Sequence, residues 1–152
     1  MNICVDIMID SPIGPVWDAI TDFENCEKMV SGILSAKVLE RPDDGLVGLK
    51  WTETRTMFGK ECDETMWITD AKEHSFYETR AENHGAIYVS KMSVNEIDGQ
   101  TKLTMSFSGT SDSMLVRIIS SVMNLFMKNS MVKMLETDLS DIKQFVEQQA
   151  SS

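Results

Sequence analysis

The feature of this sequence that most constrains its fold is a change of periodicity near Thr110. Between Ile33 and Thr110, short segments that alternate apolar and polar residues are separated by turn signals, as in antiparallel strands connected in order. After Thr110 the apolar residues recur at steps of three and four, the spacing of one helix face: Leu115, Ile118, Ile119, Val122, Met123, Phe126, Val132, Leu135, Leu139, Ile142 and Val146. Strands followed by one long helix predict an α+β fold.

The N-terminal segment predicts a strand and two short helices. Residues 2–9 alternate in polarity and therefore read as a strand. We expect Ser11 to be the N-cap of a first helix, with Pro12 in its first position. Thr21 and Glu24 have the spacing of a capping box, which predicts a second short helix to about Met29. Short helices without a long crossover argue against a parallel sheet.

Turn dipeptides set the expected register of the hairpins. The tightest candidates are Asp44-Gly45, Phe58-Gly59, His84-Gly85 and Asp98-Gly99. Centring hairpins on the last three predicts these opposite pairs: Trp51 with Met66, Glu53 with Glu64, Arg55 with Cys62, Ala81 with Tyr88, Thr79 with Ser90, Tyr77 with Met92, Val94 with Leu103, Met92 with Met105, and Ser90 with Phe107.

Each of these hairpins then has one mainly apolar side and one mainly polar side, as a one-sided antiparallel sheet requires. The exceptions on the polar side are Trp67, Phe76, Ile87 and Val89. They are either cross-strand neighbours or an exposed contact surface.

The C-terminal helix is expected to begin at a cap on Ser111 or Asp112 and to end near Glu147, a length of roughly 50 Å at 1.5 Å per residue. From Met114 to Met127 it is apolar around most of its circumference. That part could close a pocket, form a homodimer or contact a membrane. The second half is amphipathic, with its expected outer face formed by Lys133, Glu136, Asp138, Asp141, Lys143 and Glu147. A sheet with one apolar face is expected to curl around such a helix.

Size and charge narrow the possible functions. A chain of 152 residues fits one domain, expected over residues 1–150. A net charge of −10 repels a phosphate backbone, so we expect no nucleic-acid partner. No segment approaches the ~20 apolar residues of a membrane span, and the N-terminus does not read as a secretory signal. Cys4, Cys26 and Cys62 form no Cys-x-x-Cys pair, which favours free thiols in a reducing compartment and therefore a cytoplasmic protein. The lack of a segment long enough to span a bilayer predicts no integral membrane association.

Three stretches resemble a known group of proteins. They are Ile9-Asp10-Ser11-Pro12 leading to the stretch Val16–Glu24, then Gly48–Arg55, and then Leu135–Lys143. With the order of elements, they resemble the SRPBCC superfamily of START lipid-transfer domains, birch-pollen-type allergens and bacterial polyketide cyclases, and most of all its polyketide cyclase/dehydrase and lipid-transport group. The resemblance implies a helix-grip fold, a curved antiparallel sheet of about seven strands around the C-terminal helix. Its members range from enzymes to carriers, so it leaves the function open.

The trio Glu53, Arg55 and Glu64 is the strongest candidate for chemistry. The predicted register places all three on the apolar side of the sheet, where charged groups are costly unless they pair. Arg55 is expected to bridge the two glutamates. Three roles stay open: a structural ion-pair cluster, a group that orients a ligand, or an acid–base pair in an aldol-type cyclisation or dehydration.

Further inner-face residues would line a cavity or form ordinary core. Tyr77, Thr79, Tyr88 and Ser90 supply hydroxyls that need partners, from the backbone, water or a ligand. The apolar wall would consist of Trp51, Met66, Met92, Met105, Phe107, Met123 and Phe126. His74 and His84 lie at turns without neighbouring ligands, and no phosphate-binding glycine loop occurs, so we expect neither metal nor cofactor.

These observations favour a small hydrophobic or amphipathic ligand, such as a lipid, an isoprenoid or an aromatic polyketide-like molecule, bound by a carrier or binding module. The alternative is a cyclase- or dehydratase-like enzyme that uses Glu53, Glu64 and Arg55. A third, weaker hypothesis is a protein-partner module that uses the exposed face of Trp67, Phe76 and Ile87.

Overall fold

The computed structural model describes the backbone of residues 2–57, 59–83, 85–111 and 120–151, and the side chains of these residues except 111 and 120–126. The strands are β1 (Asn2–Ile9), β2 (Ile33–Glu40), β3 (Lys50–Met57), β4 (Lys60–Lys72), β5 (Phe76–Asn83), β6 (Ala86–Ile97) and β7 (Gln100–Ser111). The helices are α1 (Ile13–Ile20), the 3₁₀ turn η1 (Phe23–Asn25), α2 (Cys26–Met29) and α4 (Ser120–Ala150).

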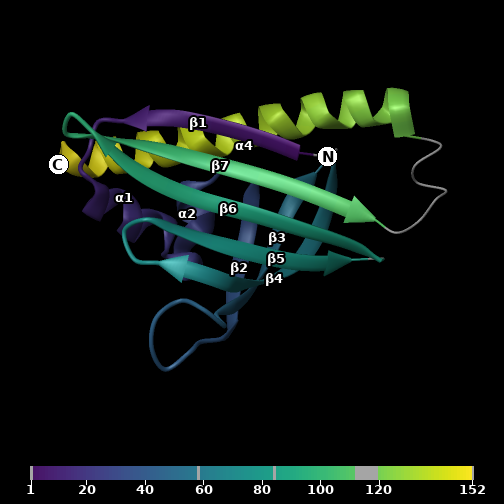
Figure 1. Cartoon of the computed structure of the whole chain (residues 1–152), viewed down its shortest axis with the longest axis horizontal. Coiled ribbons are helices and arrows are strands. Elements are labelled where there is room, and N and C mark those ends of the chain that lie inside the picture. Colours follow the sequence, from purple (N-terminus) through teal and green to yellow (C-terminus); the bar gives the residue numbers. More distant parts are fainter. Residues whose placement is uncertain (1, 58, 84, 112–119, 152) are drawn as a thin grey trace.

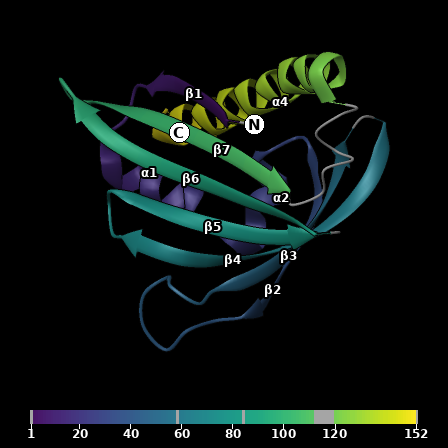
Figure 2. The same cartoon turned by 45° about the vertical axis from the view of Figure 1, so that its right-hand side comes forward.

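The strands form one seven-stranded sheet in the order β1-β7-β6-β5-β4-β3-β2, and every neighbouring pair is antiparallel. The sheet is strongly curved, and α4 lies along β1 at its edge, with α1 and α2 behind the sheet (Figures 1 and 2). This arrangement confirms the predicted helix-grip fold, including the two short helical segments after the first strand.

The hairpin registers agree with the turn positions. All nine predicted opposite pairs occur in the sheet, three in each of the hairpins β3–β4, β5–β6 and β6–β7. In the last hairpin, both turn residues have positive φ, 52° at Asp98 and 82° at Gly99. An Asp-Gly pair tolerates this conformation, which matches the twist of the two strands and thereby holds the register.

The inner face of the sheet is buried and the outer face is mostly polar. Leu49, Trp51, Ile68 and Leu103 are almost fully buried on the inner side. On the outer side, Trp67, Phe76 and Ile87 are half-buried rather than exposed. Trp67 lies opposite Arg80 and the Lys91 ammonium lies 4.3 Å from the Phe76 ring centre, so polar cross-strand neighbours shield these side chains.

Both predicted helix starts are wrong by a short distance. Pro12 occupies the N-cap position of α1, the helix begins at Ile13, and no side chain caps it. The Ser11 hydroxyl donates instead to the Pro12 carbonyl at 3.1 Å. Thr21 ends α1, since its hydroxyl donates to the Trp17 carbonyl at 2.7 Å, so it forms no capping box for η1.

The long helix differs from its prediction at its start and at one side chain. Ser111 is the last residue of β7 and not a helix cap, while Asp112, residues 114–119 of the apolar stretch and the side chains of residues 120–126 lie outside the described part of the chain. In the described second half of the helix, the predicted apolar stripe is buried, with Leu135, Leu139, Ile142 and Val146 at most 2% exposed. Asp138 was expected on the outer face but is only 5% exposed, because a partner on the sheet pairs with it.

Polar contacts fix α4 against the start of the chain. The Asp10 amide donates to Glu147 Oε1 at 2.9 Å, and the Lys143 ammonium donates to the Met8 carbonyl at 2.8 Å. Near α2, the amide and hydroxyl of Ser31 both donate to Asp141 Oδ2, at 2.9 and 2.7 Å. These bonds hold the helix in one register along β1, which determines where Asp138 meets the sheet.

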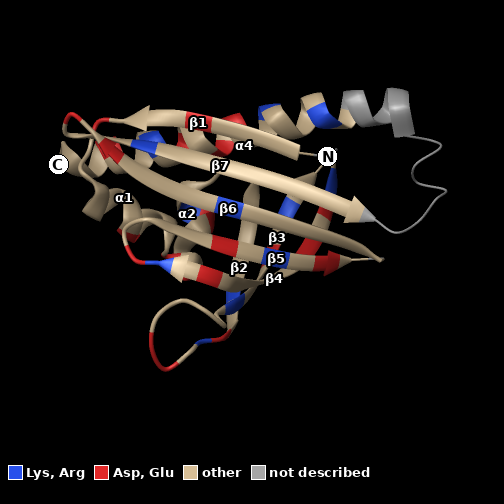
Figure 3. Cartoon of the chain, in the orientation of Figure 1, with Lys and Arg blue, Asp and Glu red and all other residues tan. Residues whose placement is uncertain are grey.

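Charges are distributed over the described surface with both signs mixed along the strands (Figure 3). None of the described helices has the length and apolar character needed to cross a bilayer.

Candidate functional site: an apolar cavity with a charged end

A cavity of about 870 Å³ lies between the inner face of the sheet and α4. This volume falls within the range of ~300–1,000 Å³ typical of small-molecule sites. Eleven residues predicted for the site line it: Trp51, Glu53, Arg55, Glu64, Met66, Tyr77, Tyr88, Ser90, Met92, Met105 and Phe107. The two remaining predicted residues, Met123 and Phe126, lie outside the described side chains.

Strand alternation explains why these residues converge. Opposite pairs in an antiparallel sheet point to the same side, so one row of pairs continues across several strands. Such a row runs from Tyr77 through Met92 and Met105 to Val5. Because the sheet curves toward α4, these rows converge on a common apolar space.

The charged end of the cavity is centred on Arg55. Its Nη2 lies 3.0 Å from Asp138 Oδ2, and its Nη1 donates to Asp138 Oδ1 at 3.3 Å. Its Nε lies 3.9 Å from Glu53 Oε2. The Trp51 indole nitrogen donates to the other Glu53 oxygen at 3.0 Å. Arg55 therefore bridges a strand carboxylate and a helix carboxylate, with side chains only 8–16% exposed.

Glu64 lies where the register predicted it but does not form the expected ion pair. It lies opposite Glu53 on β4 and lines the cavity, but Arg55 pairs with Glu53 and Asp138 instead of bridging the two glutamates. Burial, followed by the charge of Glu53, raises the pKa of Glu64 above its ordinary value. Two carboxyls thus face each other at this end of the cavity, and only one is in an ion pair with Arg55.

The other two carboxyls of the charged end also hold protons more tightly than usual. Burial raises the pKa of Glu53 despite the Trp51 hydrogen bond and the Arg55 charge. Burial likewise raises the pKa of Asp138, against the opposing effect of Arg55. Raised pKa values are useful for proton transfer, but structural ion pairs show them as well.

The hydroxyl-bearing residues are largely satisfied inside the protein. The Tyr77 hydroxyl donates to the Ile20 carbonyl at 3.1 Å, a carbonyl freed at the end of α1. Burial raises the pKa of Tyr77 as well. Thr79 and Ser90 share a short hydrogen bond between their hydroxyls. The Tyr88 ring stacks on Phe107 at 5.8 Å, so it contributes apolar surface to the cavity.

Sequence reasoning named Met123 and Phe126 from α4 but missed the lining residues of α2 and those that the structure describes in α4. The most important is Asp138, which follows Leu135 by three residues and precedes Ile142 by four, on the same helix face. That spacing was the available signal for its burial. Cys26 from α2 also lines the cavity, and burial, with the nearby Glu53 charge, raises the pKa of its thiol to about 12.

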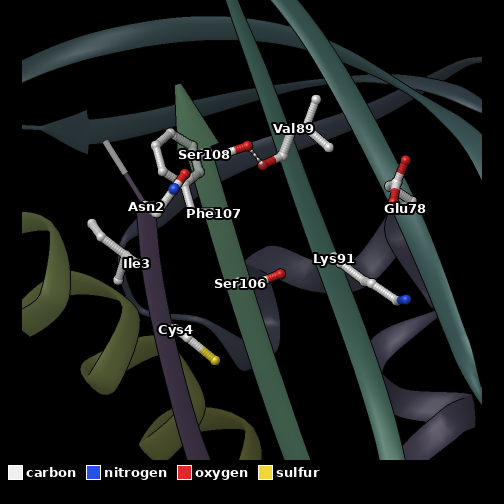
Figure 4. A pocket seen from close by; sticks show the side chains of 9 residues that line it. All are labelled: Asn2, Ile3, Cys4, Glu78, Val89, Lys91, Ser106, Phe107 and Ser108. Carbon is white, nitrogen blue, oxygen red and sulfur yellow. Dashed lines mark hydrogen bonds between the residues drawn. The ribbon is translucent and has the colours of Figure 1, made fainter. Parts of the chain in front are cut away.

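A second depression, of about 350 Å³, lies on the outer face of the sheet. Figure 4 shows the side chains of Cys4, Ser106, Lys91 and Glu78 around it, one from each of four adjacent strands. These four residues form one row of cross-strand neighbours over the outer face, and the depression has less than half the volume of the interior cavity, so the interior cavity is the better candidate site.

No group of three or more His, Cys, Asp or Glu side chains in the described part of the chain is arranged to hold a metal ion.

A curved antiparallel sheet closed on a long helix around an apolar cavity defines a helix-grip protein. The family of polyketide cyclases/dehydrases and lipid-transport proteins matches residues 2–147, and the chain therefore belongs to it. No curated protein matches the sequence.

Solved structures share the fold at low sequence identity. A START superfamily protein from Mycobacterium smegmatis has a TM-score of 0.81 and 14% identity, over 97% of this chain and 98% of its own. Ara h 8.0201 has a TM-score of 0.72 and 15% identity, over 97% of this chain and 98% of its own. The ZhuI aromatase/cyclase from Streptomyces sp. R1128 has a TM-score of 0.74 and 12% identity, over 99% of this chain and 95% of its own. Such distant similarity establishes the fold alone.

Proposed function

We propose that this protein binds a small hydrophobic or amphipathic molecule in the cavity between the sheet and α4, as a carrier or binding module. The observation that supports this most is the combination of an 870 Å³ cavity, a mostly apolar lining and a single charged end. Ligand sites commonly combine apolar walls with a few polar groups that orient the guest.

Ordinary core packing does not account for this space. Protein interiors are close-packed, with few voids larger than a water molecule. The core beside the cavity follows that rule, since Ile9, Leu49 and Leu103 are fully buried. The lining includes Met66, Met92, Met105, Met131 and Met134, whose flexible side chains adapt to guests of different shape.

The proposal is tested with N-phenyl-1-naphthylamine, an uncharged dye that fluoresces in apolar surroundings. Ser90 and Ser106 form a matched pair on neighbouring strands, because Ser90 lines the cavity and Ser106 faces outward. We expect Ser90→Trp to weaken dye binding about tenfold or more by filling the cavity, and Ser106→Trp to leave it unchanged. Equal binding by both variants, or no binding by the wild type, would refute an interior site.

An enzymatic role is the alternative, supported by the raised pKa of Glu53 and Glu64 on the cavity wall. The ZhuI aromatase/cyclase has a fold similar to that of this chain, but a shared fold does not by itself assign its activity to this chain. A poly-β-ketone offered to the purified protein would then be converted to cyclised product, and Glu53→Gln or Glu64→Gln would abolish the conversion. Recovery of the unchanged compound from the wild-type cavity supports the carrier role instead.

A further inference from the structure

The charges that face the cavity are unequal in number. Among the described lining residues, the ionisable carboxyls and cations are Glu53, Arg55, Asp63, Glu64, Lys91 and Asp138. Two of them lie at the periphery: Asp63 is exposed, and the Lys91 ammonium lies over the Phe76 ring on the outer face. The inner charges are therefore three carboxyls and one guanidinium.

The single inner cation is already engaged. All three guanidinium nitrogens of Arg55 face carboxylate oxygens, two on Asp138 and one on Glu53. Gly32 lies against this group, since a Cβ there would be 3.3 Å from Arg55 Nη1. An anionic ligand would have to displace a buried carboxylate from Arg55 and would meet the other acids, at a considerable electrostatic cost.

The carboxyl group of Glu64, in contrast, has hydrogen-bond acceptor positions that no described side chain fills. No donor among the described side chains reaches its carboxyl, although it lines the cavity directly opposite Glu53. A carboxylate has about four acceptor positions and no donor of its own when ionised. Among the described residues, Arg55 pairs with Glu53, and no positively charged hydrogen-bond donor reaches the Glu64 carboxyl.

We infer that the cavity selects amphiphiles with a protonated amine, whose ammonium lies between Glu53 and Glu64 while the apolar part lies along the methionine-lined wall. This inference rests on the proposed ligand-binding function and specifies the class of ligand. A charge-assisted hydrogen bond to Glu64 provides the preference, because such bonds are about twice as strong as neutral ones.

Three probes of equal chain length test the head group: dodecylamine, dodecanol and dodecanoic acid, each used below the concentration at which it aggregates. Their displacement of N-phenyl-1-naphthylamine gives three relative affinities. We expect dodecylamine to bind about tenfold or more tightly than dodecanol, and dodecanoic acid to bind most weakly.

Glu64→Gln should bring dodecylamine to the affinity of dodecanol, because an amide has no charge to pair with the ammonium. Glu61→Gln is the matched control, since Glu61 is exposed on the same strand and absent from the cavity lining. It removes the same charge from the protein and should keep the full preference for the amine. A preference that falls equally in both variants would show a general effect of net charge and overturn the inference.

The outcomes separate this inference from the function on which it rests. If dodecanol displaces the dye while dodecanoic acid binds as well as dodecylamine, the amine selectivity is wrong and the binding function stands. If none of the three displaces the dye, the proposed function itself fails. The ranking is measured on the wild type, so it holds as a test even if Glu64→Gln folds poorly.

Discussion

Asp138 and Arg55 are 83 positions apart in the chain, yet their charged groups are 3.0 Å apart at one end of the cavity. The contact joins the middle of α4 to the inner face of β3. It is therefore both a structural link between helix and sheet and the polar boundary of the candidate binding site.

Replacing only one partner of this ion pair should strongly destabilise the protein. Arg55→Leu leaves the buried Asp138 carboxyl without its cation, at an expected loss of about 3–5 kcal/mol in the free energy of unfolding. The double variant Arg55→Leu/Asp138→Leu should lose less than the sum of the single changes, because it leaves no orphaned partner in the pair. Urea unfolding followed by circular dichroism measures these differences.

The control for that experiment is the exposed pair of Arg41 and Glu24, 2.7 Å apart. Arg41→Gln should change stability by about 0.5 kcal/mol or less, because water screens surface ion pairs. If Arg55→Leu lowers the free energy of unfolding no more than Arg41→Gln does, the pair of Arg55 and Asp138 does not contribute to stability as proposed.

Stability should depend on pH through Glu64. Its pKa is raised by burial, so the unfolded chain loses this proton first, near the ordinary value of about 4.3. The folded state then holds more protons than the unfolded state, and the free energy of unfolding falls as pH rises until the raised pKa is passed. Glu64→Gln should remove this part of the decline, and Glu61→Gln should keep it. Parallel pH profiles for wild type and Glu64→Gln would show that the Glu64 pKa is not raised.

Cys26 should be protected from thiol reagents in the folded protein. With a pKa of about 12, roughly one thiol in 10,000 is ionised at about pH 8, and only the thiolate reacts. Cys4 and Cys62 are exposed and should react quickly with a chromogenic disulfide. We expect Cys26 to react only after unfolding, and Cys26→Ala to lose that slow phase alone. Equal rates for all three thiols would be inconsistent with the buried position.

The Tyr77 hydroxyl should serve the fold rather than the ligand. Tyr77→Phe removes its hydrogen bond to the Ile20 carbonyl, which is expected to cost about 1–2 kcal/mol of stability. Binding of N-phenyl-1-naphthylamine should stay within about twofold of the wild type, because the ring and its burial are kept. A large loss of binding at unchanged stability would assign the hydroxyl to the ligand.

The register of much of the sheet could be predicted from the sequence, because turn residues and residue alternation determine it locally. A turn such as Asp98-Gly99 determines which residues face each other, and the two-residue period then assigns Met92 and Met105 to one side. Local signals were misleading where a second local contact competes with them. The Thr21 hydroxyl bonds back to Trp17 in α1, so the capping motif read from the sequence did not form.

The candidate site was predicted only in part, because some of its contacts join distant parts of the chain. Glu53, Arg55 and Glu64 follow from the register of one hairpin, whereas the burial of Asp138 depends on a partner in a distant strand. A carboxylate on an amphipathic helix is normally solvated, so the residue type of Asp138 suggested the surface, although its spacing matches the buried face. The volume of the cavity depends on the distance between helix and sheet, which no local pattern encodes.

Because α4 follows all seven strands in the chain, a ribosome completes the sheet before it makes the helix that covers the inner side. Until then, Trp51, Met92 and Met105 belong to an open apolar trough, and Arg55 has not met Asp138. Apolar surface that is exposed in this way is prone to aggregation until it is covered. Docking of α4 then covers the trough and adds the carboxylate of Asp138 to the ion pair between Arg55 and Glu53.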